Sequence, residues 1–324
     1  MTTNPLVSII MPAYNASAYI AEAIQSVLDQ TWTNWELIIV DDGSTDDTLQ
    51  IAQQYVAKDN RIQVYHQSNQ GVSSARNNAL QYIQGDFVQY LDSDDVLDVE
   101  KLSSHINIIQ EKSFTEHDLT YGICYNLTSD GRKKQTVMHE LYKNYDNALD
   151  AQVAILENHF ISFPYSTYLL PRTIVEQVGL WNPMLNRAED SEYMLRVLSK
   201  VRSLWYVSQS IFYYREVDGS LSRRSLTQNQ MVSEMIVSQS MADVLLSMKD
   251  NSSAIRACEI HYTDVLTAWY PQNKFVIKDM LKAMKARGLK FNFENRGRLF
   301  HILKNVFGWR VAVIITKIKS KINL

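Results

Sequence analysis

The 324-residue chain has little of what marks the more specialised protein classes. Its two cysteines, Cys124 and Cys258, lie far apart, so they form neither a disulfide framework nor a metal-binding pair, and we expect a reducing compartment. The seven histidines are scattered, with no two at the spacing of zinc ligands, which argues against a zinc site. No repeat or low-complexity tract interrupts the sequence.

Long apolar runs are absent too. Residues 311–315 form one of the longest, far short of the roughly 20 apolar residues that cross a bilayer as a helix. The first apolar run has no basic segment before it and continues into residues 12–15, so we interpret it as a strand and not as a signal peptide. A net charge of -3 favours no polyanionic partner, and we expect no nucleic acid to bind.

The first third of the chain shows a regular alternation of strands and helices. Short, β-branched apolar runs predict strands at residues 6–11, 35–40, 62–66 and 87–91. Apolar residues at helical spacing predict helices at residues 17–30, 44–57, 72–83 and 97–111. We expect a capping box at Ser44 and Asp47 to open the second helix, and Gly85 to cap the end of the third. Four such repeats predict a parallel sheet with helices on both faces.

Beyond about residue 115 the order changes. We expect strands of an antiparallel region at residues 119–127 and 133–139, and further strands at 165–170, 204–207 and 211–214. We expect helices at residues 150–157, 173–178 and 188–199, and then longer ones at 228–248, 253–269, 274–286 and 298–322. The sequence therefore predicts an α/β domain of residues 1–222 and a helical C-terminal extension of residues 223–324.

Three carboxylates, Asp92, Asp94 and Asp95, follow the fourth predicted strand directly. Clustered carboxylates repel one another and are costly to remove from water, unless a bound cation compensates their charge. Mg²⁺ and Mn²⁺ prefer such oxygen ligands. The alternative is that Ser93 or Asp94 merely caps the next helix. In a parallel sheet, ligands bind beyond the carboxyl ends of the strands, where residues 12–15 and 41–43 would also lie. We therefore expect one site with an aromatic ring, several carboxylates and a divalent metal.

Six segments, taken in order, resemble the motifs of the family 2 glycosyltransferases, of the type that builds bacterial surface polysaccharides. They are VSIIMPAYN (7–15), IVDDGSTD (39–46), NQGVSSARN (69–77), LDSDD (91–95), VGLWN with AED (178–182 and 188–190), and YYR with SLS (213–215 and 220–222). The resemblance implies the GT-A fold, with a mixed sheet whose N-terminal half is mostly parallel. It also implies a nucleotide-sugar-binding half at residues 1–115 and an acceptor-binding half at residues 116–222.

The resemblance further implies transfer of a sugar, with inversion, from a nucleoside diphosphate sugar to an acceptor hydroxyl. The residues implied for the nucleotide sugar are Pro12, Ala13, Tyr14, Asn15, Asp41, Asp42, Arg76, Asp92 and Ser93. Tyr14 would offer an aromatic face, unless it is a buried structural residue. Asp42 would accept from the base, most naturally a uracil N–H, whereas Asp41 could be a turn residue. Arg76 would approach the base or diphosphate, its alternative being a solvated helix charge.

On the same resemblance, Asp92 would contact the ribose and Asp94 would bind Mn²⁺ or Mg²⁺, with Asp92 as a second metal ligand and Asp95 a weaker candidate. Asp190 would be the catalytic base and Glu189 would orient the acceptor or Asp190. The alternative is that both acids are only favoured by the dipole of the helix they open.

The closing loop departs from the family pattern. Val217 stands where the family often has a histidine that helps to hold metal or diphosphate. Either Asp218 replaces it, or diphosphate oxygens and water complete the metal shell. Arg215, Arg223 and Arg224 would then clamp the phosphates, although the last two also fit a solvated turn.

Residues 296–324 contain seven Lys or Arg and no acid. Apolar residues recur there at helical spacing, at Phe300, Leu303, Phe307, Val311, Ile314, Ile318 and Ile322. A basic amphipathic helix indicates an anchor on an anionic membrane, which would place the enzyme in the cytoplasm, peripheral on the inner face of the cytoplasmic membrane. The alternatives are packing on the protein's own core or on a second subunit, so a homo-oligomer stays open. Gly308 interrupts the helix.

Three other functions compete with this one. A processive polysaccharide synthase would need membrane-spanning helices and a Gln-x-x-Arg-Trp motif, and the sequence shows neither. A nucleotidyltransferase would carry a Gly-rich loop after the first strand, but residues 12–17 contain no glycine. A non-catalytic nucleotide-sugar-binding scaffold is disfavoured by the intact Asp92, Asp94 and Asp190. The acceptor would be a lipid-linked or growing surface glycan, and the sugar itself is not specified.

Overall fold

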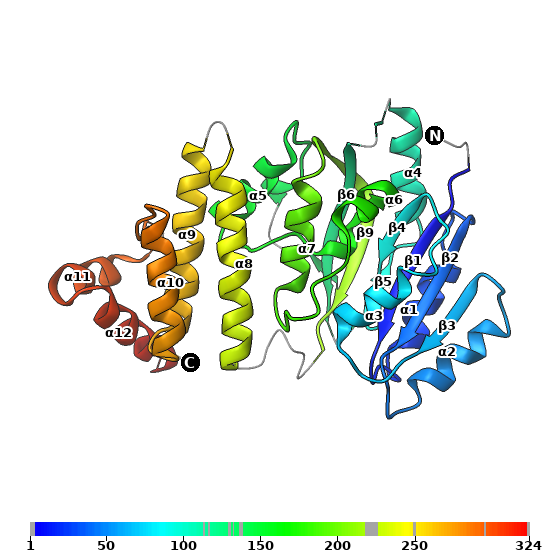
Figure 1. Cartoon of the computed structure of the whole chain (residues 1–324), viewed down its shortest axis with the longest axis horizontal. Helices are drawn as coiled ribbons and strands as arrows, with labels where there is room; N and C mark the ends of the chain where they lie inside the picture. Colours follow the sequence, from blue (N-terminus) through cyan, green and yellow to red (C-terminus); the bar gives the residue numbers. More distant parts are fainter. Residues whose placement is uncertain are drawn as a thin grey trace. The chain divides into compact units, whose positions relative to one another are not determined.

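The computed structural model describes residues 4–112, 114–115, 117–128, 131, 133–135, 139–217, 226–248, 251–294 and 296–322. The chain forms two compact units, shown together in Figure 1. The first comprises Met1–Ala151 and Phe163–Ser225, and the second comprises Gln152–Ser162 and Leu226–Leu324. The boundary predicted near residue 222 lies outside the described residues. The short segment 152–162, which we had placed in the α/β domain, belongs with the C-terminal helices.

The first unit is built on one mixed sheet. Its strands are β1 (Val7–Ala13), β2 (Trp35–Asp41), β3 (Ile62–His66), β4 (Phe87–Tyr90), β5 (Val96–Leu97), β6 (Asp118–Leu127), β7 (Lys133–Gln135), β8 (Tyr168–Pro171) and β9 (Ser203–Arg215). Its helices are α1 (Ile20–Leu28), α2 (Thr48–Val56), α3 (Val72–Ala79), α4 (Lys101–Glu111), α6 (Arg172–Val178) and α7 (Glu189–Leu198), with 3-10 turns η1 (His139–Leu141) and η2 (Tyr165–Thr167). The strand order is β3-β2-β1-β4-β8-β6-β9-β5, and β7 pairs with β6.

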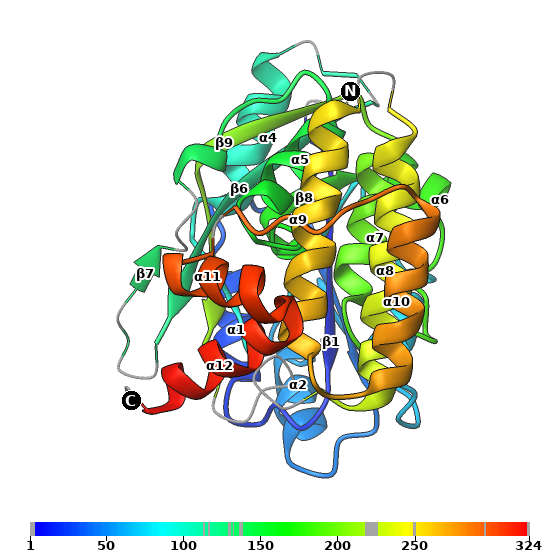
Figure 2. The ribbon, with the colours of Figure 1, turned by 90° about the vertical axis from the view of Figure 1, so that its left-hand side faces the viewer.

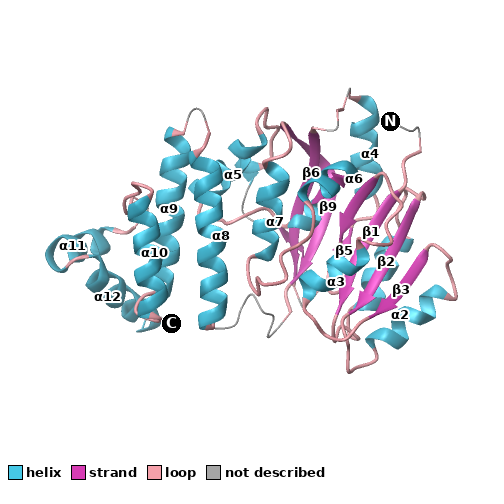
Figure 3. Ribbon diagram, in the orientation of Figure 1, coloured by secondary structure: helices cyan, strands magenta, loops and turns pink. Residues whose placement is uncertain are grey.

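The N-terminal half of the sheet is parallel, as the alternating pattern predicts. β1 pairs in parallel with β2 and β4, and β2 pairs in parallel with β3. Every residue of β1 and β2 is buried, because helices cover the sheet on both sides (Figure 3), and this explains their continuous apolar runs. Val7, Ile9 and Met11 pack in one core cluster with side chains of α1, α2 and α4.

The second half of the sheet is only partly antiparallel. β8 runs antiparallel to both β4 and β6, but β6 and β9 pair in parallel. The two short strands expected at residues 204–207 and 211–214 form one strand, β9. Its pairing with β6 shifts register between Tyr121 and Ile123, where Gly122 lies against Ser210 so closely that no Cβ would fit. The start of the strand expected at residues 165–170 is instead the turn η2.

Two predicted helix ends were wrong. Ser44 opens no helix: α2 begins at Thr48, and its N-cap residue Asp47 makes no side-chain capping bond. Gly85 does not cap α3, which ends at Ala79. A Cβ at Gly85 would lie 2.6 Å from the backbone nitrogen of Ser8, so the glycine allows close contact with β1.

The second unit is helical. Its helices are α8 (Gln228–Leu246), α9 (Ser252–Trp269), α10 (Lys274–Ala286), α11 (Arg298–Phe307) and α12 (Trp309–Ile322), joined by the end of α5 (Ala148–Glu157), which begins in the first unit. Thr227 and Gln230 form a capping box at the start of α8. Gly308, at φ +80°, divides the single helix expected at residues 298–322 into α11 and α12. Within the described part of the chain, none of the helices combines the length and the apolar character needed to cross a membrane.

Candidate active site

The predicted site residues lie in the first unit, at one edge of its parallel strands. The register pairs Ala13 with Asp41 and Ile10 with Tyr90, so β1, β2 and β4 end close together. The segments that follow these strands, residues 14–15, 42–44 and 91–95, therefore share this edge, as we expected from the sequence.

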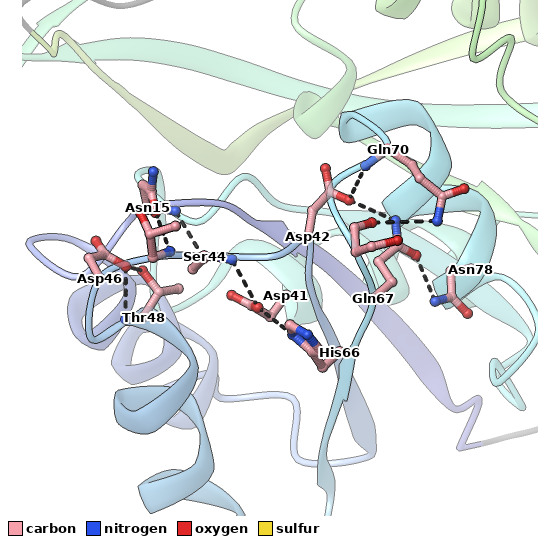
Figure 4. A network of polar contacts seen from close by, with 12 residues as sticks. Asn15, Asp41, Asp42, Ser44, Asp46, Thr48, His66, Gln67, Gln70 and Asn78 are labelled. Atoms are coloured by element: carbon pink, nitrogen blue, oxygen red, sulfur yellow. Dashed lines mark hydrogen bonds and ion pairs between the residues drawn. The ribbon is translucent and has the colours of Figure 1, made fainter.

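Hydrogen bonds join the loops after β1 and β2. The backbone N–H of Asn15 donates to Ser44 Oγ (3.0 Å), and the N–H of Thr45 donates to Asn15 Oδ1 (2.8 Å), as Figure 4 shows in part. Nearby, Asp46 accepts from the backbone of Ser17 and from Thr48. Burial alone would raise the pKa of Asp46, but these hydrogen bonds lower it to about 2. Asn15 thus has a structural role in holding the two loops together.

Asp41, the last residue of β2, and Asp42, which follows it, are both buried, but they have different partners (Figure 4). Asp42 accepts three hydrogen bonds, from Gln67 Nε2 (2.8 Å) and from the backbone N–H groups of Gln70 (2.9 Å) and Gly71 (2.8 Å). Asp41 Oδ2 pairs with His66 Nδ1 at 2.8 Å and accepts from the N–H of Ser44, the contact expected of a turn residue. A carboxylate has about four acceptor positions, so Asp42 retains room for one further donor.

Tyr14 is half-exposed, with 51% of its surface accessible, whereas Pro12 and Ala13 before it are buried. The alternative that Tyr14 is a buried structural residue was therefore wrong. Its ring is accessible at the edge where β1 ends.

Arg76 of α3 is a buried cation and not the solvated helix charge that was the alternative. Only 2% of it is exposed, and its Nη2 donates to Asp92 Oδ1 (3.1 Å) and to the hydroxyl of Tyr165 (2.6 Å). Its Nη1 lies 3.5 Å from Glu189 Oε1. Burial opposes its charge, but Tyr165, Asp92 and Glu189 together raise its pKa above the ordinary value. One guanidinium thus connects the segment after β4 with the start of α7.

The aromatic side chains around Arg76 were missed as site residues. The guanidinium carbon lies 4.6 Å from the ring centre of Tyr165 and 4.3 Å from that of Trp181. Trp181 stacks on Tyr193 with ring centres 4.0 Å apart and donates to the hydroxyl of Tyr90 (3.0 Å). Tyr165 lies in η2, Tyr193 in α7 and Tyr90 in β4, and Trp181 lies in the loop before α7. Of these, only Trp181 lies in a recognisable motif. They fix the position of Arg76.

The acid cluster after β4 is not a helix cap. β5 follows it, and α4 begins only at Lys101, so the capping alternative for Ser93, Asp94 and Asp95 was wrong. Asp95 is buried and accepts from the backbone N–H of Arg215 (2.8 Å), which attaches the cluster to β9. The guanidinium of Arg215 donates to the carbonyl of Asp94 (2.8 Å) and pairs with Glu22 (2.7 Å).

The negative charge of this cluster is poorly compensated. Burial, and then repulsion by Asp92, raise the pKa of Asp94 to about 6. Burial also raises the pKa of Asp95, and Asp94 and Asp92 add to that effect. These carboxylates therefore fit a divalent cation. Among the described residues, however, no three Asp, Glu, His or Cys side chains are grouped closely enough to hold a metal by themselves.

Glu189 and Asp190 open α7, after Ala188 at a left-handed φ of +57°. Asp190 Oδ1 accepts from the N–H of Ser191 (2.7 Å). Burial and the neighbouring Asp190 raise the pKa of Glu189, and Arg76 opposes this shift. Both acids therefore occupy the position that the helix dipole favours, and Glu189 also contacts the donor-side network.

Some expected residues lie elsewhere or outside the described range. Asp218, Arg223 and Arg224 lie outside it, as do Ser220, Leu221 and Ser222 of the closing motif. A cavity of about 370 Å³ lies at the opposite edge of the sheet, where β4 and β6 begin. It is lined by Pro5, Asp86, Phe87, Ile109, Phe114, Thr115, Asp118, Thr120, Leu169, Pro171 and Thr173. It contains none of the predicted site residues.

Solved structures share this architecture. The crystal structure of S. aureus TarS 1-349 in complex with UDP superposes with a TM-score of 0.69 at 20% identity, covering 96% of this chain and 91% of that one. The complex of the same protein with UDP-GlcNAc gives a TM-score of 0.67 at 21% identity, covering 87% and 80%. At such low identity the likeness shows the fold alone, which is the GT-A type of mixed sheet that the sequence predicts.

Sequence comparisons agree with the motifs. The chain is 36% identical over 220 residues to the glycosyltransferase TuaG of Bacillus subtilis (strain 168), whose name assigns it provisionally to teichuronic acid biosynthesis; the match covers 67% of this chain and 82% of that protein. Glycosyltransferase GlyG of Streptococcus pneumoniae serotype 4 is 28% identical over 224 residues, covering 67% and 73%. The family model described as Glycosyl transferase family 2 matches residues 8–169. With the strand-end motifs in place and these matches beside them, the chain belongs to glycosyl transferase family 2.

Proposed function

We propose that the first unit transfers a sugar from a UDP-sugar to an acceptor hydroxyl with inversion at the anomeric carbon. The observation that carries this proposal is the bridge made by Arg76, which contacts Asp92 after β4 and Glu189 at the start of α7. The bridge brings the predicted donor residues and the predicted acceptor residues into one network. A site that only bound a nucleotide sugar would not need the predicted acceptor residues.

On the donor side, the exposed ring of Tyr14 would contact the nucleobase beside the buried Pro12 and Ala13. Asp42 would accept from the base with its remaining acceptor position, because its other three bonds hold residues 67–71. Asp92 would contact the ribose, and Ser93 and Arg76 would complete the donor site. Asn15 and Asp41 would act by shaping the loops. The choice of UDP is supported by the UDP and UDP-GlcNAc complexes of TarS.

A divalent metal, Mn²⁺ or Mg²⁺, would be held by Asp94 and Asp92. When bound it would neutralise the charge that develops on the leaving diphosphate. The carboxylates supply the acceptor oxygens and the negative charge that such an ion requires. Because no three-residue metal cluster occurs among the described side chains, ligands from the diphosphate or water would complete the shell.

On the acceptor side, Asp190 would remove the proton from the attacking hydroxyl, and Glu189 would orient the acceptor or Asp190. The attacking oxygen would form its bond to the anomeric carbon as the bond to the diphosphate breaks, opposite the nucleophile. The proton would leave on the Asp190 carboxylate and the bonding electrons would leave with the nucleoside diphosphate.

The decisive test is Asp190→Asn, compared with Glu192→Gln on the same helix turn. We expect Asp190→Asn to lower the transfer rate by about 10²–10⁴-fold, as is usual for loss of a general base, with UDP-sugar binding retained. Glu192→Gln removes one acid of the same first turn but should leave transfer largely intact. Donor binding would be followed as a Mn²⁺-dependent rise in melting temperature across a panel of nucleotide sugars. Transfer by Asp190→Asn at the wild-type rate would rule out this base, and equal small losses in both variants would favour the helix-dipole explanation.

The acceptor and the location form a further part of the proposal. By analogy with the name of TuaG, we propose a lipid-linked or growing cell-surface glycan as the acceptor. Such an acceptor would place the enzyme at the inner face of the cytoplasmic membrane as a peripheral protein. The two widely separated cysteines fit a reducing cytoplasmic setting. A homo-oligomer is one alternative use of the C-terminal helices.

A further inference from the structure

The last two helices of the second unit, α11 and α12, lie next to each other (Figure 2), and part of each packs on that unit. Phe300, Ala312 and Val313 are buried in a cluster with Phe293. Lys317 Nζ donates to the carbonyls of Ala268 (2.8 Å) and Tyr270 (2.7 Å) at the end of α9. The alternative, that this region packs on the protein's own core, is therefore correct for these residues.

The opposite face of each helix is apolar and exposed. We call it the outer face, consisting of Leu299, Ile302 and Val306 on α11 and Val311, Ile315 and Ile318 on α12. The spacings are i, i+3, i+7 and i, i+4, i+7, so each set forms one stripe of its helix. Val306 is 66% exposed and Ile302 and Ile318 are each 53% exposed, and Phe307 adds a further exposed ring. The single stripe expected from sequence is thus wrong, because Phe300 faces inward and Ile318 outward.

The charges around the outer face have one sign. Residues 296–324 contain seven Lys or Arg and no acid. Arg298, Arg310 and Lys319 are exposed on the same two helices that carry the apolar stripes. Arg296 and Lys317, by contrast, are used within the unit: Arg296 pairs with Asp264 (3.1 Å) and Lys317 caps α9.

We propose that the outer face binds an anionic lipid membrane, with its apolar side chains inserted among the acyl chains and its cations at the level of the lipid phosphates. A second copy of the chain is the less suitable occupant, because a symmetric contact would place the same basic surface against itself. The outer face would explain how the enzyme reaches the proposed membrane location. The inference shares only that location with the proposed function and does not depend on the chemistry of sugar transfer.

The test uses the full chain and vesicles of phosphatidylcholine with or without phosphatidylglycerol. We expect sedimentation with the phosphatidylglycerol vesicles only, weakened by salt because the charges are screened. The combined variant Ile302→Ser, Val306→Ser, Ile315→Ser and Ile318→Ser should lower vesicle binding about tenfold or more. The matched control is Phe275→Ser, which removes a ring that is 79% exposed on α10 of the same unit and should not change binding.

A second variant keeps the test decisive if the apolar variant folds poorly. Arg310→Gln with Lys319→Gln leaves the packed face intact and should also lower binding about tenfold or more. UDP-sugar binding should be unchanged in both variants, which separates this inference from the proposed function. No binding of the wild-type chain to anionic vesicles, or binding by both variants that is as strong as that of the wild type, would overturn it. A different result would also overturn it: the wild-type chain is a dimer in sedimentation equilibrium, the apolar variant is a monomer, and neither binds vesicles. That result would identify a second copy of the chain as the occupant of the outer face.

Discussion

Lys101, at the start of α4, is a fully buried lysine outside the candidate active site. Its Nζ donates to the carbonyl of Thr167 and to Ser210 Oγ, each at 3.2 Å, and lies 3.3 Å from His105 Nε2. Burial lowers its pKa to about 7, and the nearby Cys124 opposes the shift only weakly. Burial and Lys101 together also lower the pKa of His105 far below its usual range, so the imidazole is neutral. The cluster is polar and buried, and Lys101 loses its charge as the pH rises above about 7.

We predict that the free energy of unfolding rises with pH between about 7 and 10.5 because of Lys101. In that interval the unfolded lysine, with a pKa of 10.5, holds a proton that the folded lysine has lost, so acid favours the unfolded state. The slope would approach about 1.4 kcal/mol per pH unit. Urea unfolding at several pH values should give a slope that is more positive in the wild type than in Lys101→Met by this amount, because other groups such as Cys258 contribute equally in both proteins. His105 and Ser210 keep their own contact of 2.7 Å in the variant. Identical slopes in the two proteins would contradict the prediction.

At the scale of elements, Gly85 shows how tightly β1 packs against the segment before β4. Its N–H donates to Ser8 Oγ (2.8 Å), and that hydroxyl donates to Glu36 Oε1 (2.6 Å). An added Cβ would lie 2.6 Å from Ser8 N and 2.7 Å from the carbonyl oxygen of Leu6, and backbone atoms cannot easily move away.

We therefore predict that Gly85→Ala destabilises the protein by about 1–3 kcal/mol, the usual cost of overpacking. Gly297→Ala is the matched control, since no atom lies within 4 Å of the position of its added Cβ. Thermal and urea unfolding of both variants would measure the difference. Equal stabilities for the two variants would show that the backbone around Gly85 adjusts to an added methyl group more easily than its close contacts suggest.

The elements also show how far the sequence alone can predict the structure. β1 and β2 were predictable because they are buried on both faces and leave a continuous apolar signal. β9 was divided in two because Ser208 and Gln209 are exposed and Ser210 is buried against Gly122, so its centre has no apolar pattern. Gly85 was misassigned as a cap because local sequence cannot show a close contact with a strand about eighty residues away.

The candidate site divides in the same way. The positions of Tyr14, Asp42 and Asp92 followed from the ends of predicted parallel strands, which meet at one edge by geometry. The burial of Arg76 did not follow, because the rings of Tyr165 and Trp181 that enclose it come from distant segments. The triple hydrogen bonding of Asp42 likewise depends on how residues 67–71 fold back, which has no signature in residues 41–43.

At the scale of the whole molecule, the two units are not consecutive pieces of chain. α5 begins in the first unit, and its end, with residues 152–162, belongs to the second. In that segment Ile155 and Leu156 are buried, Gln152 contacts Met241 Sδ at 3.6 Å, and His159 pairs with Asp264 at 2.5 Å. A chain that ends before α8 would therefore lack the residues that this segment contacts, Met241 and Asp264.

We predict that a chain ending at residue 225 is less stable and more prone to aggregate than the full chain. Exposing two buried aliphatic side chains alone costs about 3–6 kcal/mol, and the segment would present an apolar surface. A chain ending at residue 295 is the comparison: it loses the cluster around Phe300 but keeps α8, α9 and α10, so it should be destabilised less than the chain ending at residue 225. Size-exclusion chromatography and melting temperatures would compare the three proteins. A shorter chain that melts like the full one would show that residues 152–162 do not need the helical unit.

The bridge made by Arg76 has a thermodynamic consequence. Asp92 and Glu189 share one buried guanidinium, so a ligand that draws either carboxylate away changes the electrostatic environment of the other. On the proposed function, such sharing would couple donor binding to acceptor binding. By reciprocity, the factor by which a bound donor alters acceptor affinity must equal the factor by which a bound acceptor alters donor affinity. The coupling through this one side chain would therefore be the same whichever substrate binds first.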